Sequence, residues 1–128
     1  MTARLQSVVA VVDDDERILE SLEDLLESAG FSARTFGSAE AFLRSDAVRE
    51  AACLISEIRM PAIDGWELER RVSRERPDLP VILVTGQEPE QPGADLSAAP
   101  ARVAAIFRKP FDGPALLAAV ARAVERGS

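Results

Sequence analysis

Polar and charged side chains stand at or just beyond the ends of several apolar runs in this sequence. The set comprises Asp13, Asp14, Glu57, Thr85 and Lys109. Carboxylates that gather in one place repel each other and favour a cation, and Mg²⁺ prefers carboxylate and carbonyl oxygens. A carboxylate beside Mg²⁺ can act as a nucleophile toward a phosphoryl group, whose oxygens a hydroxyl and an ammonium can then stabilise. These residue types therefore predict Mg²⁺-assisted phosphoryl chemistry.

The elements that must position these residues are short strands alternating with helices. Apolar, β-branched-rich runs predict strands at 8–12, 31–36, 53–58, 81–84 and 103–107. A run without polar alternation, such as 8–12, is typical of a strand that is covered on both faces. The alternation predicts a parallel sheet with helices on both sides, in which ligands bind at the carboxyl ends of the strands. The polar set is expected to converge at that edge.

Helical periodicity and capping signals predict the connecting helices. Apolar residues recur on one face up to Ala29, and Gly30 is placed to end that helix. Ser38 is the expected N-cap of a second helix, 66–76 is amphipathic, and Asp112 is expected to cap the last helix. By contrast, 88–100 contains three prolines and little apolar periodicity. The helix between the last two strands is therefore expected to be irregular or shortened.

Length, charge and residue usage narrow the class of protein. A chain of 128 residues is expected to form one domain, and a net charge of −7 argues against direct nucleic-acid binding and against a polybasic membrane contact. The single cysteine, Cys53, excludes an internal disulfide and is expected to be a small buried side chain. Without a signal peptide or a membrane-spanning run, a cytoplasmic location is expected.

The sequence contains no histidine. This absence excludes a Ser-His-Asp or Cys-His catalytic device, a His-ligated zinc ion and a phosphohistidine on this chain. Any chemistry must therefore depend on carboxylates, hydroxyls, the lysine and a metal ion.

Four stretches, in a fixed order, carry a specific resemblance: VVDDDER, LISEIRMPAIDGWEL, PVILVTG and FRKPF. Over essentially its whole length, as one domain of residues 1–128, the chain resembles a receiver domain of a bacterial two-component response regulator. SAEAFL and the TG after the fourth strand resemble the FixJ-like branch. The resemblance implies an α/β, flavodoxin-like (CheY-like) three-layer sandwich, with a five-stranded parallel sheet of order 2-1-3-4-5.

The resemblance also implies roles for single residues. Asp13 and Asp14 match the acidic pair that holds Mg²⁺, with Asp14 the more direct ligand and the backbone carbonyl of Arg59 an additional one. Thr85 matches the hydroxyl that moves onto the phosphoryl group. Lys109 matches the lysine that pairs with that group, and the peptide bond that follows it is typically cis in the family.

Glu57 stands where the family has its phosphoacceptor aspartate, which is also a metal ligand. Its extra methylene pushes the carboxylate toward Asp14 and the metal, and a misplacement of about 1 Å can cost on the order of 100-fold in rate. Ser56 alternates to the other face of the strand and is not expected to replace it. We predict lost phosphorylation. Whether Glu57 imitates a phosphoryl group or simply pairs with Lys109 in a disused pocket stays open.

Two further departures concern signal output. The family's switch aromatic corresponds to Ile106, and Phe107 is expected on the opposite face of the strand. Because 88–100 belongs to the face that the family uses for output and dimerisation, that surface is expected to be reshaped.

Three hypotheses for function follow. The first is a non-enzymatic pseudo-receiver that acts through contacts with a histidine kinase or another signalling protein, with homodimerisation left open. The second is a working Mg²⁺-dependent receiver, phosphorylated from a phosphohistidine donor, because the acidic pair, Thr85 and Lys109 are all present. The third, a flavodoxin-type cofactor binder, is disfavoured because acids replace the phosphate-cradling loop. The chain ends near its expected last helix, so a stand-alone receiver or a fragment is expected.

Overall fold

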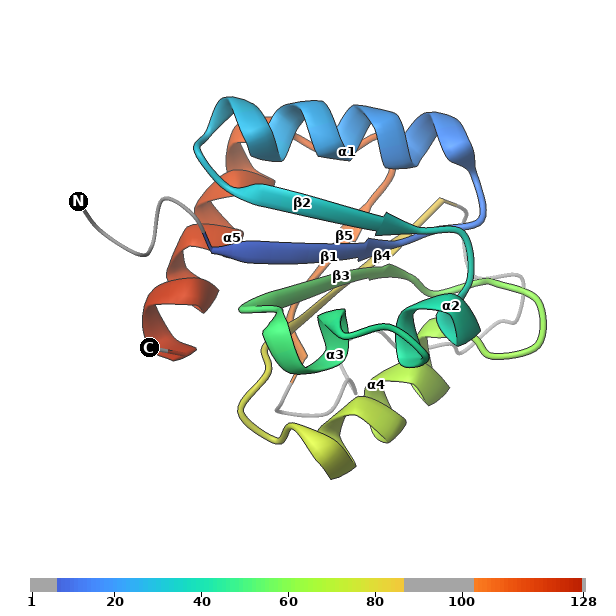
Figure 1. Cartoon of the computed structure of the whole chain (residues 1–128). Coiled ribbons are helices and arrows are strands. Elements are labelled where there is room, and N and C mark those ends of the chain that lie inside the picture. The colour runs from blue at the N-terminus through green and yellow to red at the C-terminus, as the bar shows by residue number, and fades with distance from the viewer. Residues whose placement is uncertain (1–6, 87–102, 128) are drawn as a thin grey trace.

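The structure of the protein is a computed structural model that describes residues 7–86 and 103–127 (Figure 1). In chain order the elements are β1 (Val8–Val12), α1 (Glu16–Ser28), β2 (Ser32–Phe36), α2 (Ala39–Leu43), α3 (Ala47–Glu50), β3 (Cys53–Glu57), α4 (Gly65–Glu75), β4 (Val81–Thr85), β5 (Val103–Arg108) and α5 (Gly113–Gly127). The strands form one parallel sheet of order β2-β1-β3-β4-β5. The predicted α/β fold and strand order are confirmed.

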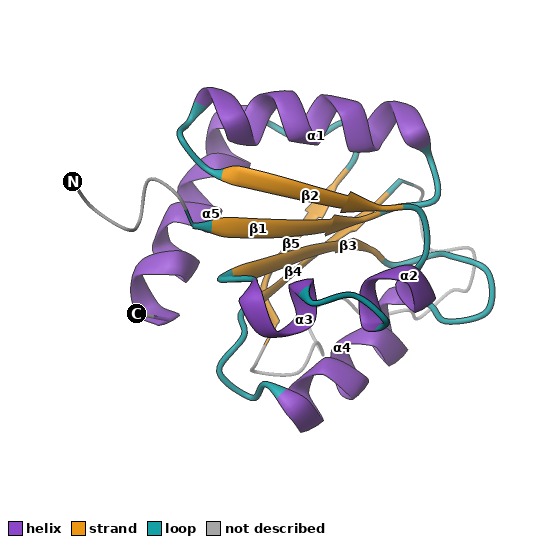
Figure 2. Ribbon diagram, viewed as in Figure 1, coloured by secondary structure: helices purple, strands orange, loops and turns teal. Residues whose placement is uncertain are grey.

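The sheet is the middle of three layers. Figure 2 shows α1 and α5 on one face, and α2, α3 and α4 on the other. In β1, Val9 and Val11 pack in the core beneath α1 and α5, while Ala10 and Val12 pack in the core beneath α2, α3 and α4. Since a strand alternates its side chains between faces, both faces of β1, β3 and β4 must be apolar. This explains the unbroken apolar runs in the sequence.

Short polar side chains start the helices. Ser38 accepts a hydrogen bond from the backbone N–H of Ala41 at 3.1 Å, and Asp112 accepts one from Ala115 at 3.4 Å. Both predicted caps are thus confirmed. Each cap satisfies a backbone donor that has no partner within its own helix.

Several predictions for single residues are also confirmed. Cys53 is fully buried. Ile106 and Phe107 pack on opposite faces of the sheet, and the Lys109-Pro110 bond is cis. None of the described helices combines the length and the apolarity that a membrane span requires.

Two predictions about helices need comment. The helix predicted after Ser38 is α2, and the short helix α3 that follows it has no counterpart among the sequence predictions. The predicted irregular helix at 88–100 lies outside the described residues and stays a prediction.

Arg76 holds α3 in place from the end of α4. Its Nη1 donates to the backbone oxygens of Val48 at 3.0 Å, Arg49 at 3.2 Å and Ala51 at 2.9 Å. The guanidinium also pairs with Asp78 at 3.0 Å. A four-residue helix is too short to be stable alone, and this cationic cap on its last carbonyls stabilises it together with the burial of Ala47 and Val48 in the core.

Replacing Arg76 by alanine is expected to lower the free energy of unfolding by about 2 kcal/mol, because charged hydrogen bonds to partly buried carbonyls are lost. Urea unfolding followed by far-UV circular dichroism measures this change. Arg74→Ala, an exposed change on the same helix, serves as the matched control and is expected to shift stability by under about 0.5 kcal/mol. Equal effects of the two substitutions would contradict the role of Arg76.

Candidate functional site

The predicted convergence of polar side chains occurs at the carboxyl edge of the sheet. Asp13 follows β1, Glu57 ends β3, Thr85 ends β4 and Lys109 follows β5. Glu57 pairs in register with Val84 of β4, and Val84 is the residue before Thr85. Parallel strands end together, so residues far apart in the chain meet at this edge.

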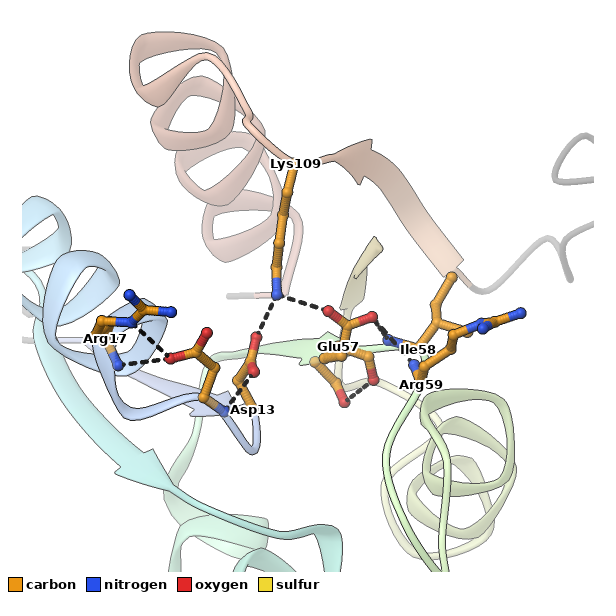
Figure 3. A network of polar contacts seen from close by, with 8 residues as sticks. Asp13, Arg17, Glu57, Ile58, Arg59 and Lys109 are labelled. Atoms are coloured by element: carbon orange, nitrogen blue, oxygen red, sulfur yellow. Dashed lines mark hydrogen bonds and ion pairs between the residues drawn. The ribbon is translucent and has the colours of Figure 1, made fainter. Parts of the chain in front are cut away.

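The ammonium group of Lys109 lies between two carboxylates (Figure 3). Its Nζ is 2.8 Å from Asp13 Oδ2 and 2.6 Å from Glu57 Oε1. The exposed side-chain fractions are 16% for Lys109, 2% for Asp13 and 6% for Glu57. The backbone N–H of Lys109 donates to the Thr85 carbonyl at 2.8 Å, which anchors the start of the side chain. These three side chains form a buried ionic cluster that joins β1, β3 and the end of β5.

Backbone donors occupy the remaining carboxylate oxygens of the cluster. Glu57 Oε2 accepts from the N–H groups of Ile58 at 2.8 Å and Arg59 at 3.1 Å (Figure 3). Asp13 Oδ1 accepts from the N–H of Asp15 at 2.9 Å. Every oxygen of the two buried carboxylates therefore has at least one donor, as buried charge requires. The two backbone donors next to Glu57 had no signal in the sequence.

Burial and pairing shift the titration of the cluster in definite directions. Burial raises the pKa of Asp13 above its usual value, and this outweighs the lowering by the hydrogen bond from Lys109. Burial alone would lower the pKa of Lys109, but its hydrogen bonds to Asp13 and Glu57 outweigh burial, and the pKa is raised above 10.5. Lys109 therefore keeps its positive charge at neutral pH.

Stability is expected to fall on the alkaline side in two stages. Burial raises the pKa of the Cys53 thiol from 9.0 to about 12, so above pH 9 only the unfolded chain gains a thiolate. The free energy of unfolding then falls by about 1.4 kcal/mol per pH unit. A second loss begins above pH 10.5, because Lys109 then loses its proton more readily in the unfolded chain.

The composition makes this titration simple to measure. The sequence contains no tyrosine and no histidine, and Lys109 is its only lysine. Urea unfolding at pH steps from 8 to 11 should therefore give a slope near pH 10 that disappears in Cys53→Ala. An unchanged slope in that variant would contradict the assignment to the thiol.

Gly65 allows α4 to approach the end of β3. A Cβ atom at this position would lie 2.5 Å from the carbonyl oxygen of Glu57 and 2.8 Å from Cα of Ile58. The N–H of Gly65 also donates to the Ile58 carbonyl at 2.7 Å. The absence of a side chain at Gly65 therefore lets the start of α4 lie directly against the backbone of Glu57 and Ile58.

Asp14 does not join the ionic cluster. Its side chain is exposed and lines a groove of about 420 Å³, together with Ser38, Arg44 and Met60 among others. Within residues 7–86 and 103–127, no three side chains of Asp, Glu, His or Cys lie together as ligands for a metal ion. The carboxylates as arranged do not fit the Mg²⁺ site that their types predicted, because an ammonium lies between two of them.

Known proteins resemble this chain in sequence and in fold. The family profile of the response regulator receiver domain matches residues 9–121. Over 120 residues, which are 94% of this chain, it is 36% identical to the transcriptional regulatory protein FixJ of Azorhizobium caulinodans and 34% identical to the response regulator protein TmoT of Ectopseudomonas mendocina. The matches cover 56% and 54% of those proteins, so the chain spans about half the length of these curated relatives.

A solved structure agrees. The crystal structure of FixJ-N superposes with a TM-score of 0.77 at 30% identity, and the match covers 94% of each chain. The FixJ-like resemblance inferred from short motifs is thus supported along nearly the whole sequence. The chain belongs to the response regulator receiver family, and it is a receiver domain of the two-component type.

Proposed function

We propose that this receiver is an atypical one, in which Glu57 stands at the phosphoacceptor position and is not phosphorylated. The observation that carries the proposal is that both oxygens of the Glu57 carboxylate are engaged. One lies 2.6 Å from the Lys109 ammonium, and the other accepts from the N–H groups of Ile58 and Arg59.

These contacts oppose nucleophilic attack. A carboxylate that attacks phosphorus needs an oxygen lone pair aimed at the incoming group, and each Glu57 oxygen already accepts at least one hydrogen bond, which lowers its nucleophilicity. Freeing Oε1 would separate it from the ammonium, and freeing Oε2 would break its hydrogen bonds to the N–H groups of Ile58 and Arg59, of which the Ile58 N–H also donates to the Val84 carbonyl at 2.8 Å. The longer Glu57 side chain thus occupies the Lys109 ammonium and two backbone N–H groups, which would otherwise stabilise a transferred phosphoryl group.

The same contacts support a fixed signalling state. Glu57 Oε2 already accepts from two successive backbone N–H groups, an arrangement that suits an anionic oxygen. The contact of Oε1 with Lys109 at 2.6 Å is the one expected of a disused pocket, so the two contacts together support imitation of a phosphoryl group and an inert pocket equally. Ile106, at the position of the switch aromatic, packs against the core beneath α4 and has no ring to reorient.

Within this proposal, the chain forms one receiver domain that acts in the cytoplasm through contacts with a histidine kinase or another signalling protein. The family match over residues 9–121 supports the single domain. Homodimerisation is a second kind of contact within this proposal. It is tested by measuring the mass of the native protein in solution.

A working receiver is the second candidate. Asp13, Thr85 and Lys109 lie at the same edge of the sheet as Glu57, which is the placement that phosphoryl transfer needs. In that case the Glu57 carboxylate would leave its donors and accept a phosphoryl group from a phosphohistidine.

Intact-mass measurement after incubation with acetyl phosphate and Mg²⁺ tests both candidates. Native protein and Glu57→Asp are treated side by side, and hydroxylamine distinguishes an acyl phosphate from a phosphate ester. We expect no added phosphoryl mass on the native protein. A hydroxylamine-labile phosphoryl group on native protein, lost in Glu57→Gln, would overturn the proposal and establish a working receiver.

Labelling of Glu57→Asp alone would show that the glutamate is what silences the site. If neither protein is labelled, the loss of phosphorylation extends beyond Glu57, and the native protein is still unphosphorylated as proposed.

A further inference from the structure

We propose that the ammonium group of Lys109 is a built-in counter-ion that takes the place of a divalent cation, so that the site excludes Mg²⁺. The inference rests on the contacts of the ionic cluster and not on whether Glu57 accepts a phosphoryl group. It is therefore tested without a phosphodonor.

The ammonium occupies the position that a shared metal ion would need. It lies 2.8 Å from Asp13 and 2.6 Å from Glu57, on one oxygen of each buried carboxylate. Mg²⁺ requires oxygen ligands at about 2.0–2.1 Å in octahedral geometry. A metal bound to these same two oxygens would lie within a few ångströms of a positive charge, and the two cations would repel each other.

The other oxygens of the cluster do not offer an alternative. Asp13 Oδ1 accepts from the N–H of Asp15, and Glu57 Oε2 accepts from two N–H groups. Rotation of either carboxylate toward a metal would break these backbone hydrogen bonds as well as the contact with the ammonium. Asp14, which is exposed, is the remaining acid of the predicted ligand set, and a single carboxylate holds Mg²⁺ only weakly.

Lys109 is also anchored at its backbone, and its side chain lies close to Gly86. Its N–H donates to the Thr85 carbonyl at 2.8 Å. Its stem runs past Gly86, where an added Cβ would lie 3.4 Å from Lys109 Cδ and 3.9 Å from Nζ. The length of Glu57 contributes as well, because its carboxylate reaches the backbone donors and the ammonium at the same time.

Metal-dependent stabilisation is the first test. The melting temperature of native protein is expected not to change when MgCl₂ is raised to about 10 mM at constant ionic strength. Lys109→Met keeps an unbranched apolar stem but removes the charge, so this variant is expected to gain Mg²⁺ affinity by at least about tenfold and to melt higher as MgCl₂ is added. Lys109→Met combined with Asp13→Asn is the matched control and should lose that gain.

Chemical labelling of native protein is the second test, and it does not depend on the folding of any variant. Because Lys109 is the only lysine, the mass shift from an amine-reactive reagent reports the amino terminus and this one side chain. Peptide mapping separates the two. We expect the labelling rate of Lys109 to be slow and unchanged by Mg²⁺.

Two results would overturn the inference. One is a Lys109 labelling rate that rises with Mg²⁺ in native protein, since that would show a metal displacing the ammonium. The other is a folded Lys109→Met variant whose melting temperature does not respond to Mg²⁺. Phosphorylation of native protein would contradict the proposed function. The melting temperatures and the Lys109 labelling rate would still decide separately whether the site excludes Mg²⁺.

Discussion

Replacing Lys109 by methionine is expected to lower the free energy of unfolding by about 3–5 kcal/mol at pH 7, because two buried carboxylates are left without their counter-charge. The two side chains are only 2% and 6% exposed, so water screens their repulsion poorly. Urea unfolding, monitored by far-UV circular dichroism in metal-free buffer, measures the loss. A wild-type free energy of unfolding in the usual range for single domains leaves the variant folded, so the two unfolding curves can be compared.

The charge origin of this loss can be separated from a loss of packing. Adding Asp13→Asn and Glu57→Gln to Lys109→Met removes both negative charges and is expected to restore much of the lost stability. In the single variant the penalty should also shrink as the pH falls, because burial raises the pKa of Asp13 and protonation of that carboxylate removes its uncompensated charge. A loss below about 1 kcal/mol, or one that is independent of pH, would show that the cluster is not a significant source of stability.

Replacing Gly65 by alanine is expected to lower the free energy of unfolding by about 2–4 kcal/mol. The added Cβ would lie 2.5 Å and 2.8 Å from backbone atoms of Glu57 and Ile58, which no side-chain rotation can relieve. Either α4 or the end of β3 must move, and Glu57 moves with it. Alanine is otherwise the better helix former, so any destabilisation has a steric cause.

Gly37→Ala is the matched control for this substitution. A Cβ at position 37 has no atom within 4 Å, so its effect is expected to stay within about 0.5 kcal/mol. The Gly65→Ala variant should also label faster at Lys109 with an amine reagent, because displacement of Glu57 weakens the ionic cluster. A stable Gly65→Ala variant with unchanged labelling would mean that the backbone at this contact adapts without cost.

Much of the fold follows from local sequence patterns. The unbroken apolar runs of β1, β3 and β4 predicted strands buried on both faces, and their bounds agree with the structure to within a residue or so. The reason is that a parallel strand between two helical layers has no solvent-facing side, which leaves no room for polar alternation. Capping residues such as Ser38 and Asp112 act through bonds to their own chain neighbours, so their roles were also predictable.

The helix α3 was not predictable in the same way. Its four residues are too few to show a period, and its stability depends on Arg76, which lies at the end of α4. Contacts between distant parts of the chain leave no regular mark in either segment. A similar limit applies to Gly65, whose neighbour in space, the Glu57 carbonyl, is close only because α4 folds back over β3.

The sequence by itself placed the polar residues at one edge of the sheet, because every parallel strand delivers its last residue to that same edge. It did not determine how they pair. Asp13 continues the alternation of β1 and is buried, whereas the adjacent Asp14 lies in the following turn and is exposed. The sequence placed Lys109 at this edge and left its pairing with Glu57 open. Tertiary structure decided that its ammonium, ninety-six positions after Asp13, lies between Asp13 and Glu57, since only the folded chain decides which donor reaches a buried carboxylate.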